Sequence, residues 1–143
     1  MGKIKRFEEL EVWNLARDFA KEIYKITTND YFSKDFRFRD QMRASSGSIM
    51  DNIAEGFERN GNKEFIQFLY FSKGSCGETR SQLYRALDNS YISEVEFGTL
   101  YNKAIQLSQS ISLFIQYLKK SEITGHKNLK PSVGEGEFKD LKI

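Results

Sequence analysis

Polar side chains of the kinds used in binding and catalysis follow two segments at the spacing of one helix face. In the first segment they recur every fourth or third position, as Gln41, Ser45, Ser48, Asn52, Glu55 and Arg59. In the second, Ser72, Cys76 and Thr79 form a similar row, with Ser75 and Glu78 beside it. Because residues at this spacing share a helix face, the two rows predict a polar region where two helices meet.

Three interpretations of this region are open. In the first, small side chains let two helices pack closely and the polar groups satisfy one another, since an unpaired buried polar group costs about 1–3 kcal/mol. In the second, the rows line a polar pocket that binds a ligand. In the third, Asn52, Glu55 and Glu78 serve an enzyme. We take close packing as the expectation.

Other catalytic and metal-binding patterns are missing from the sequence. A di-iron site in a helical bundle needs Glu-x-x-His pairs, and the only histidine, His126, is not part of one. Cys76 has no histidine to activate it. The glycines of "SKGSCGE" do not follow a predicted strand, as a phosphate-binding loop requires. We therefore predict that the protein is not an enzyme and has no cofactor and no metal site.

Basic residues gather on the same two segments, with aromatic residues between them. The candidates for nucleic-acid contacts are Arg39, Arg43, Arg59, Lys63, Lys73 and Arg80. The net charge is only +2, from 22 basic and 20 acidic residues, whereas nucleic-acid binders usually carry a larger basic excess or a basic stripe. A basic surface would have to arise from geometry or from symmetric assembly, and the alternative is a solvated face of mixed charge.

Four amphipathic helices are predicted to position these residues. They cover about residues 8–27, 35–58, 63–88 and 93–120. Gly61 is expected to be the stop after the second helix, Asn60 or Asn62 to cap the third helix, and Ser93 with Glu96 to form a capping box for the fourth. The regular core row of the third helix comprises Phe65, Leu69, Ser72, Cys76, Thr79, Leu83, Ala86 and Ser90.

Short connections between these helices predict an all-α fold, an antiparallel up-down-up-down four-helix bundle in residues 1–120. Residues 121–143 lose the periodicity and contain the only proline, which predicts a flexible C-terminal tail. A single cysteine, Cys76, is typical of a reducing compartment, and no apolar run is long enough to cross a bilayer. We expect a soluble, cytoplasmic protein with no membrane partner.

The outward face of the third helix predicts self-association. Ile66, Tyr70, Gly77, Tyr84 and Tyr91 fall together on that face, and Gly74 lies near it. A glycine inside a helix costs about 1 kcal/mol relative to alanine, so two glycines among tyrosines indicate that another backbone packs there. The most economical result is a closed ring or a dimer.

The segments "FEELEVWNLARDFAKEIYKIT", "FRDQMRASSGSIMDNIAEGFERNGNKEF" and "FSKGSCGETRSQLYRA" resemble the four-helix bundle family named after proteins encoded in 23S ribosomal RNA intervening sequences. The same family looks like that of the accessory variability determinant of diversity-generating retroelements. The resemblance covers residues 7 to about 118, and "QMRASSGSIMDNIAEGF" is its most specific part.

This resemblance implies an antiparallel bundle that assembles as a ring, typically a pentamer, and that associates with RNA or with a nucleic-acid-processing protein. The retroelement branch is strongly basic, a pattern from which this chain departs. The residues matching the family pattern are Gln41, Arg43, Ser48, Asn52, Glu55, Gly56, Gly74, Ser75 and Glu78. The match implies roles in packing and assembly for them, as we also expect for Gly77. The alternative function is a purely structural oligomeric scaffold that docks a partner protein.

Overall fold

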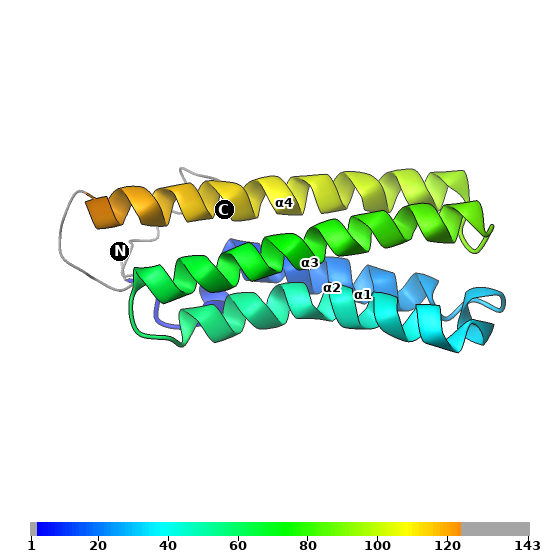
Figure 1. The fold of residues 1–143 in the computed structure, drawn as a ribbon, viewed down its shortest axis with the longest axis horizontal. Coiled ribbons are helices and arrows are strands. Elements are labelled where there is room, and N and C mark those ends of the chain that lie inside the picture. Colours follow the sequence, from blue (N-terminus) through cyan, green and yellow to red (C-terminus); the bar gives the residue numbers. More distant parts are fainter. Residues whose placement is uncertain (1–2, 124–143) are drawn as a thin grey trace.

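The computed structural model describes residues 3–123, which form four antiparallel α-helices packed side by side as an up-down-up-down bundle (Figure 1). The helices are α1 (Glu11–Ile26), α2 (Phe36–Phe57), α3 (Asn62–Asp88) and α4 (Glu94–Ile123). Each helix packs against its neighbours in sequence, and α1 also contacts α4. The predicted all-α four-helix bundle is confirmed. The predicted flexible tail lies beyond residue 123 for most of its length, outside the described residues.

The chain enters α1 later than the periodicity predicts. Phe7–Glu9 forms a short 3-10 helix, η1, and the extended residue Leu10 separates it from α1. Leu10 is 1% exposed, and the Phe7 ring packs against Trp13 with their centroids 5.1 Å apart. Burying Leu10 requires the chain to bend at this point, and the helical spacing alone does not show the bend.

Gly61 lies in the α2–α3 turn but is not the residue that stops α2, because that helix ends at Phe57 and Gly61 directly precedes α3. This residue has φ +101°, a conformation that glycine adopts without a steric penalty. The predicted cap of α3 is wrong, because neither Asn60 nor Asn62 caps the helix with its side chain. Asn62 is instead the first residue of α3, and its buried Nδ2 donates to the carbonyl of Leu118 at 3.5 Å. A contact across the bundle therefore takes the place of a local cap.

The start of α4 agrees with the predicted capping box. Glu96 N donates to Ser93 Oγ at 3.0 Å, and Ser93 N donates back to Glu96 Oε1 at 2.9 Å. Two amides that have no partner within the helix are thereby satisfied. The helix continues to Ile123, three residues beyond the predicted end.

The core is a continuous set of aliphatic and aromatic side chains from all four helices. Seven of the eight residues of the predicted α3 row are buried; Ser90 is exposed, because α3 ends before it. On the opposite face, the prediction was wrong for Ile66, which is buried, whereas Tyr70 and Tyr84 are exposed. Within residues 3–123 no helix has the length and apolarity needed to cross a bilayer.

Hydrogen bonds tie the two connections at one end of the bundle to each other. Asn29 Nδ2 donates to the Tyr91 carbonyl at 2.9 Å, and the Tyr91 hydroxyl donates to Asp35 Oδ2 at 2.9 Å. The other oxygen of Asp35 accepts from Phe38 N and caps α2. The bond to Asp35 raises the pKa of the Tyr91 hydroxyl. The α1–α2 connection and the α3–α4 turn are thus held as one unit.

Candidate functional site

Small polar side chains form a buried seam between α2 and α3, as the close-packing interpretation expects. Ser72 Oγ donates to the carbonyl of Ile49 at 2.8 Å. Thr79 Oγ1 lies 3.0 Å from Ser45 Oγ, which in turn donates to Gln82 Oε1 at 2.5 Å. Gln82 is only 4% exposed. The hydroxyl groups therefore satisfy one another within the subunit, as buried polar groups must.

Sequence reasoning missed Gln82 as a member of this seam. It lies seven residues after Ser75 and three after Thr79, so its spacing places it on the same side of α3. Ser75 also contacts α2, through a 3.2 Å bond from its Oγ to Ser48 Oγ. Asn52 then covers Ser48, with Nδ2 2.9 Å from both the carbonyl and the hydroxyl oxygen.

The acidic members of the two predicted rows lie outside the seam. Glu55 and Glu78 are exposed, and Glu55 pairs with Arg59 at 3.0 Å. The expectation that these carboxylates satisfy other groups at the core edge is wrong. Their positions on α2 and α3 are rotated outward from those of the serines. Gln41 and Glu78 instead line an open polar groove of about 530 Å³ between the two helices.

Gly56 marks the closest approach of α2 to α3. A Cβ built at this position would lie 2.6 Å from Phe68 Cβ and 3.0 Å from Phe65 Cδ1. Real Cβ atoms do not come this close to another carbon, so only glycine fits here without a shift of α3. The residue therefore sets the distance between the two helices next to their turn.

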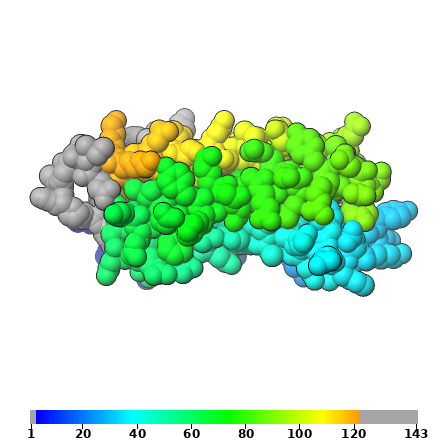
Figure 2. Space-filling model, viewed as in Figure 1, coloured from blue at the N-terminus to red at the C-terminus, as the bar shows by residue number. Residues whose placement is uncertain are grey.

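Gly74 and Gly77 are different, because both lie in open space on α3. The surface of α3, in green, runs across the face of the molecule seen in Figure 2. A Cβ at either position would meet no atom within 4 Å. Tyr70 and Tyr84 on the same face are 44% and 49% exposed. Nothing in the described subunit requires a glycine at these two positions.

The six predicted basic residues do not form one patch. Arg59 and Lys63 lie at the α2–α3 turn, where Arg59 pairs with Glu55 and lies 4.9 Å from the ring of Phe68. Lys73 and Arg80 lie on α3 close to Cys76, whose thiol points to α4. Arg39 and Arg43 form a further pair, because they are four positions apart on α2 and so lie on one side of it.

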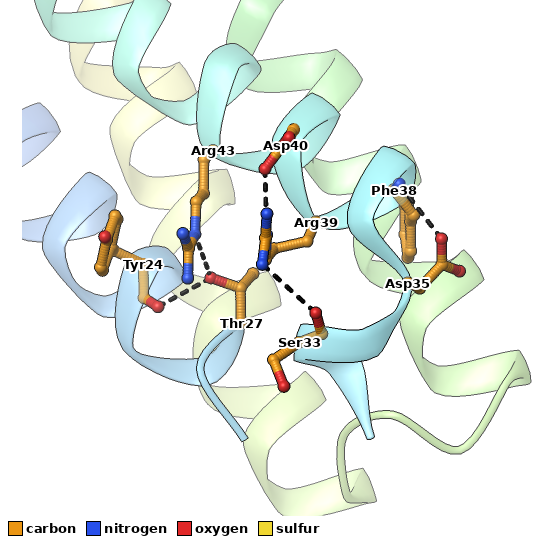
Figure 3. Close-up of polar contacts among 8 residues, drawn as sticks. All are labelled: Tyr24, Thr27, Ser33, Asp35, Phe38, Arg39, Asp40 and Arg43. Carbon is orange, nitrogen blue, oxygen red and sulfur yellow. Dashed lines mark hydrogen bonds and ion pairs between the residues drawn. The ribbon is translucent and has the colours of Figure 1, made fainter. Parts of the chain in front are cut away.

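Arg39 and Arg43 sit near the junction of α1 with α2 (Figure 3). The Arg43 guanidinium lies 3.8 Å from the centroid of the Tyr24 ring, and its Nε donates to Thr27 Oγ1 at 2.7 Å. Arg39 bonds to Asp40 at 3.0 Å and to the carbonyl of Ser33 at 3.3 Å. Both cations are held in place by neighbouring groups.

A second group of basic residues, which the sequence reasoning overlooked, lies on α1. Arg17, Lys21 and Lys25 are exposed and line a groove that α1 forms with Met50 of α2. Their i, i+4, i+8 spacing was the signal that could have identified them, since such residues fall on one helix face. The predicted basic residues all belong to the second and third helices and their junction, so this row is not among them.

Cys76 is buried, and its Sγ donates to the carbonyl of Ala104 at 3.3 Å. Burial raises the pKa of this thiol to about 11, so it is a neutral group near pH 7 and not a nucleophile. Within residues 3–123 no group of three His, Cys, Asp or Glu side chains could hold a metal ion.

The buried thiol makes stability depend on pH. The unfolded chain ionises Cys76 near its ordinary pKa of 9.0, whereas the folded chain holds the proton to about 11. The free energy of unfolding should therefore fall as the pH rises from 9 to 11. We expect Cys76→Ala to lose this part of the fall when urea unfolding is compared at pH 8 and pH 10.5. An equal decrease in the free energy of unfolding in both proteins would contradict this prediction.

Comparison with known proteins relates this geometry to a family. The family model described as 23S rRNA-intervening sequence protein matches residues 8–113. A crystal structure of a protein of unknown function from the S23 ribosomal protein family of Bacteroides thetaiotaomicron VPI-5482 superposes with a TM-score of 0.68. The two are 24% identical, over 73% of this chain and 98% of the other, which shows a shared fold. No curated protein matches this chain.

Proposed function

Since the matching model spans well over half of its length, the chain belongs to the 23S rRNA-intervening sequence protein family, and from that premise we propose that it is a non-catalytic, self-associating bundle that binds RNA. In this proposal several copies form a ring, five by the family resemblance. The partner is RNA or a nucleic-acid-processing protein. The setting is the cytoplasm, where the free thiol of Cys76 stays reduced.

The outward face of α3 is the observation that carries self-association. Gly74 and Gly77 each cost a helix about 1 kcal/mol relative to alanine, and no neighbour within the subunit requires them. The exposed rings of Tyr70 and Tyr84 lie on the same face. A helix of a second copy would bury these rings and use the room that the glycines leave.

A second apolar surface supports a ring over a two-fold dimer. Leu15 of α1 and Leu113 of α4 are 37% and 42% exposed and line a groove of about 500 Å³ between these helices. This groove and the α3 face are unlike surfaces of one subunit. Contacts between unlike surfaces run head to tail, and they close into a ring when the rotation allows.

Native mass spectrometry of protein purified without nuclease tests the proposal. We expect an oligomer with heterogeneous extra mass, and removal of that mass by ribonuclease without loss of the oligomer. A monomer would contradict self-association.

The second candidate function, an oligomeric scaffold that docks a partner protein, is favoured by the apolar groove between α1 and α4. It predicts an oligomer without extra mass and without salt-dependent binding of RNA. This outcome would refute the RNA part of the proposal and retain the assembly.

A further inference from the structure

Three basic residues of α1 line the groove that this helix forms with α2. Arg17, Lys21 and Lys25 point into the groove toward α2. Because a helix rises 1.5 Å per residue, successive members of this row are about 6 Å apart along the axis. All three side chains are exposed. The row is therefore a regularly spaced series of three cations that winds slightly around α1 and that solvent can reach.

Two of the three acidic residues of α1 have contacts or neighbours on its α4 side. Glu22 pairs with Lys103 of α4, and Asp18 lines the other groove, together with Lys103. Glu22 is also the one acidic side chain that reaches the rim of the groove toward α2, and its charge is already paired. The net charge of +2 for the whole chain thus gives no sign of this local row of three cations, of which Lys25 also lines a groove with Glu22 and with Glu96 of α4.

Residues of α2 extend the basic side across the groove. Arg43 is fixed over Tyr24, which is 55% exposed and lines the groove. Arg39 follows one turn earlier on α2 (Figure 3). The floor is apolar, with Ala20 and Met50. The result is an open channel of about 790 Å³ that is lined by the three cations of α1, with Arg43 of α2 stacked on its Tyr24.

We propose that this α1–α2 channel is the surface that binds the sugar–phosphate backbone of RNA, an inference that rests on the RNA-binding function proposed above. Regularly spaced cations neutralise consecutive phosphates, and an open channel accepts a continuous strand. The other predicted basic residues are less suited. Arg59 and Lys63 lie at the α2–α3 turn, away from this channel, and Lys73 and Arg80 lie beside the α3 face assigned to self-association.

Fluorescence anisotropy with a labelled random-sequence single-stranded RNA tests this inference on the full chain. The variant is Lys21→Gln/Lys25→Gln, and the matched control is Lys5→Gln/Lys63→Gln, which loses the same charge at two exposed positions outside the channel and away from the α3 face. We expect the first variant to weaken binding at least tenfold in low salt. The dependence of log affinity on log salt concentration should become less steep, by about 1.4 in slope, since each lost contact with a single strand contributes about 0.7. The control should change affinity less than twofold.

The possible failures are distinguishable. If the wild-type protein binds no RNA, the proposed function fails and this inference with it. If the wild-type protein binds RNA but the two double variants lose affinity equally, or the control loses more, the α1–α2 channel is the wrong surface. If poly-glutamate competes as well as RNA of equal charge, the channel recognises acidic polypeptides and the assignment to RNA is overturned.

Discussion

Gly56→Ala should destabilise the subunit by about 1–3 kcal/mol, because it forces a Cβ into occupied space. The new atom would lie 2.6 Å from Phe68 Cβ and 3.4 Å from the carbonyl oxygen of Phe65. Neither is the free end of a side chain that could swing aside. Relief requires α3 to move away from α2, and this movement would stretch the hydrogen bonds of the polar seam, among them Ser72 to Ile49.

Gly47→Ala is the matched control for this change. It makes the same substitution on the same helix, at a position where a Cβ meets no atom within 4 Å. Alanine should then stabilise the subunit by up to about 1 kcal/mol through its higher helix propensity. Urea unfolding followed by circular dichroism measures both values. Opposite signs are expected, and a neutral or stabilising Gly56→Ala would show that α3 yields without cost.

Gly77→Leu should separate folding from assembly. No atom of the subunit lies within 4 Å of the added Cβ, so the fold and the helical content should be retained. A second helix packed on this face would meet a bulky side chain where it now has room. We expect the dissociation constant of the oligomer to rise about a hundredfold or more, a loss of about 2.7 kcal/mol or more per contact.

Sedimentation velocity over a concentration series measures this dissociation. Gly47→Leu on α2 serves as the control, because it adds the same side chain at another open position. An oligomer that is unchanged by Gly77→Leu but disrupted by Gly47→Leu would move the assembly face from α3 to α2. If neither variant changes the oligomer, the open glycines have no role in assembly.

Local rules predicted most of the fold. The apolar period located α2, α3 and α4, and the box of Ser93 and Glu96 appeared where its sequence pattern placed it. The errors arose where a distant contact decided the local structure. Asn62 is an ordinary cap candidate by type, but its side chain is used by Leu118 on the far side of the bundle. A single segment carries no trace of such a contact.

The candidate site was predicted only in part, because residues that belong to the same two helices can face different sides of the bundle. Arg43, Arg59 and Arg80 lie against α1, at the α2–α3 turn and beside Cys76, respectively. The small residues between α2 and α3 were easier to predict, because close packing of two helices directly favours serine and glycine. The row of Arg17 and Lys21 could have been found from its spacing in the sequence. That Arg43 of α2 lies near this row depends on how α1 and α2 pack, which the spacing does not show.

The hydrogen bonds among Asn29, Tyr91 and Asp35 couple two connections at one end of the bundle. At the tied end, the α1–α2 connection cannot detach while the α3–α4 turn stays in place, because each holds the other. The two must open in one cooperative event, and their amides should exchange with solvent at a common rate. The α2–α3 turn at the opposite end is anchored differently, because Asn62 bonds to Leu118 of α4 and Arg59 lies over the ring of Phe68. Each end of the bundle therefore has its own side-chain anchor, but only the end beside the basic channel has two connections that depend on each other.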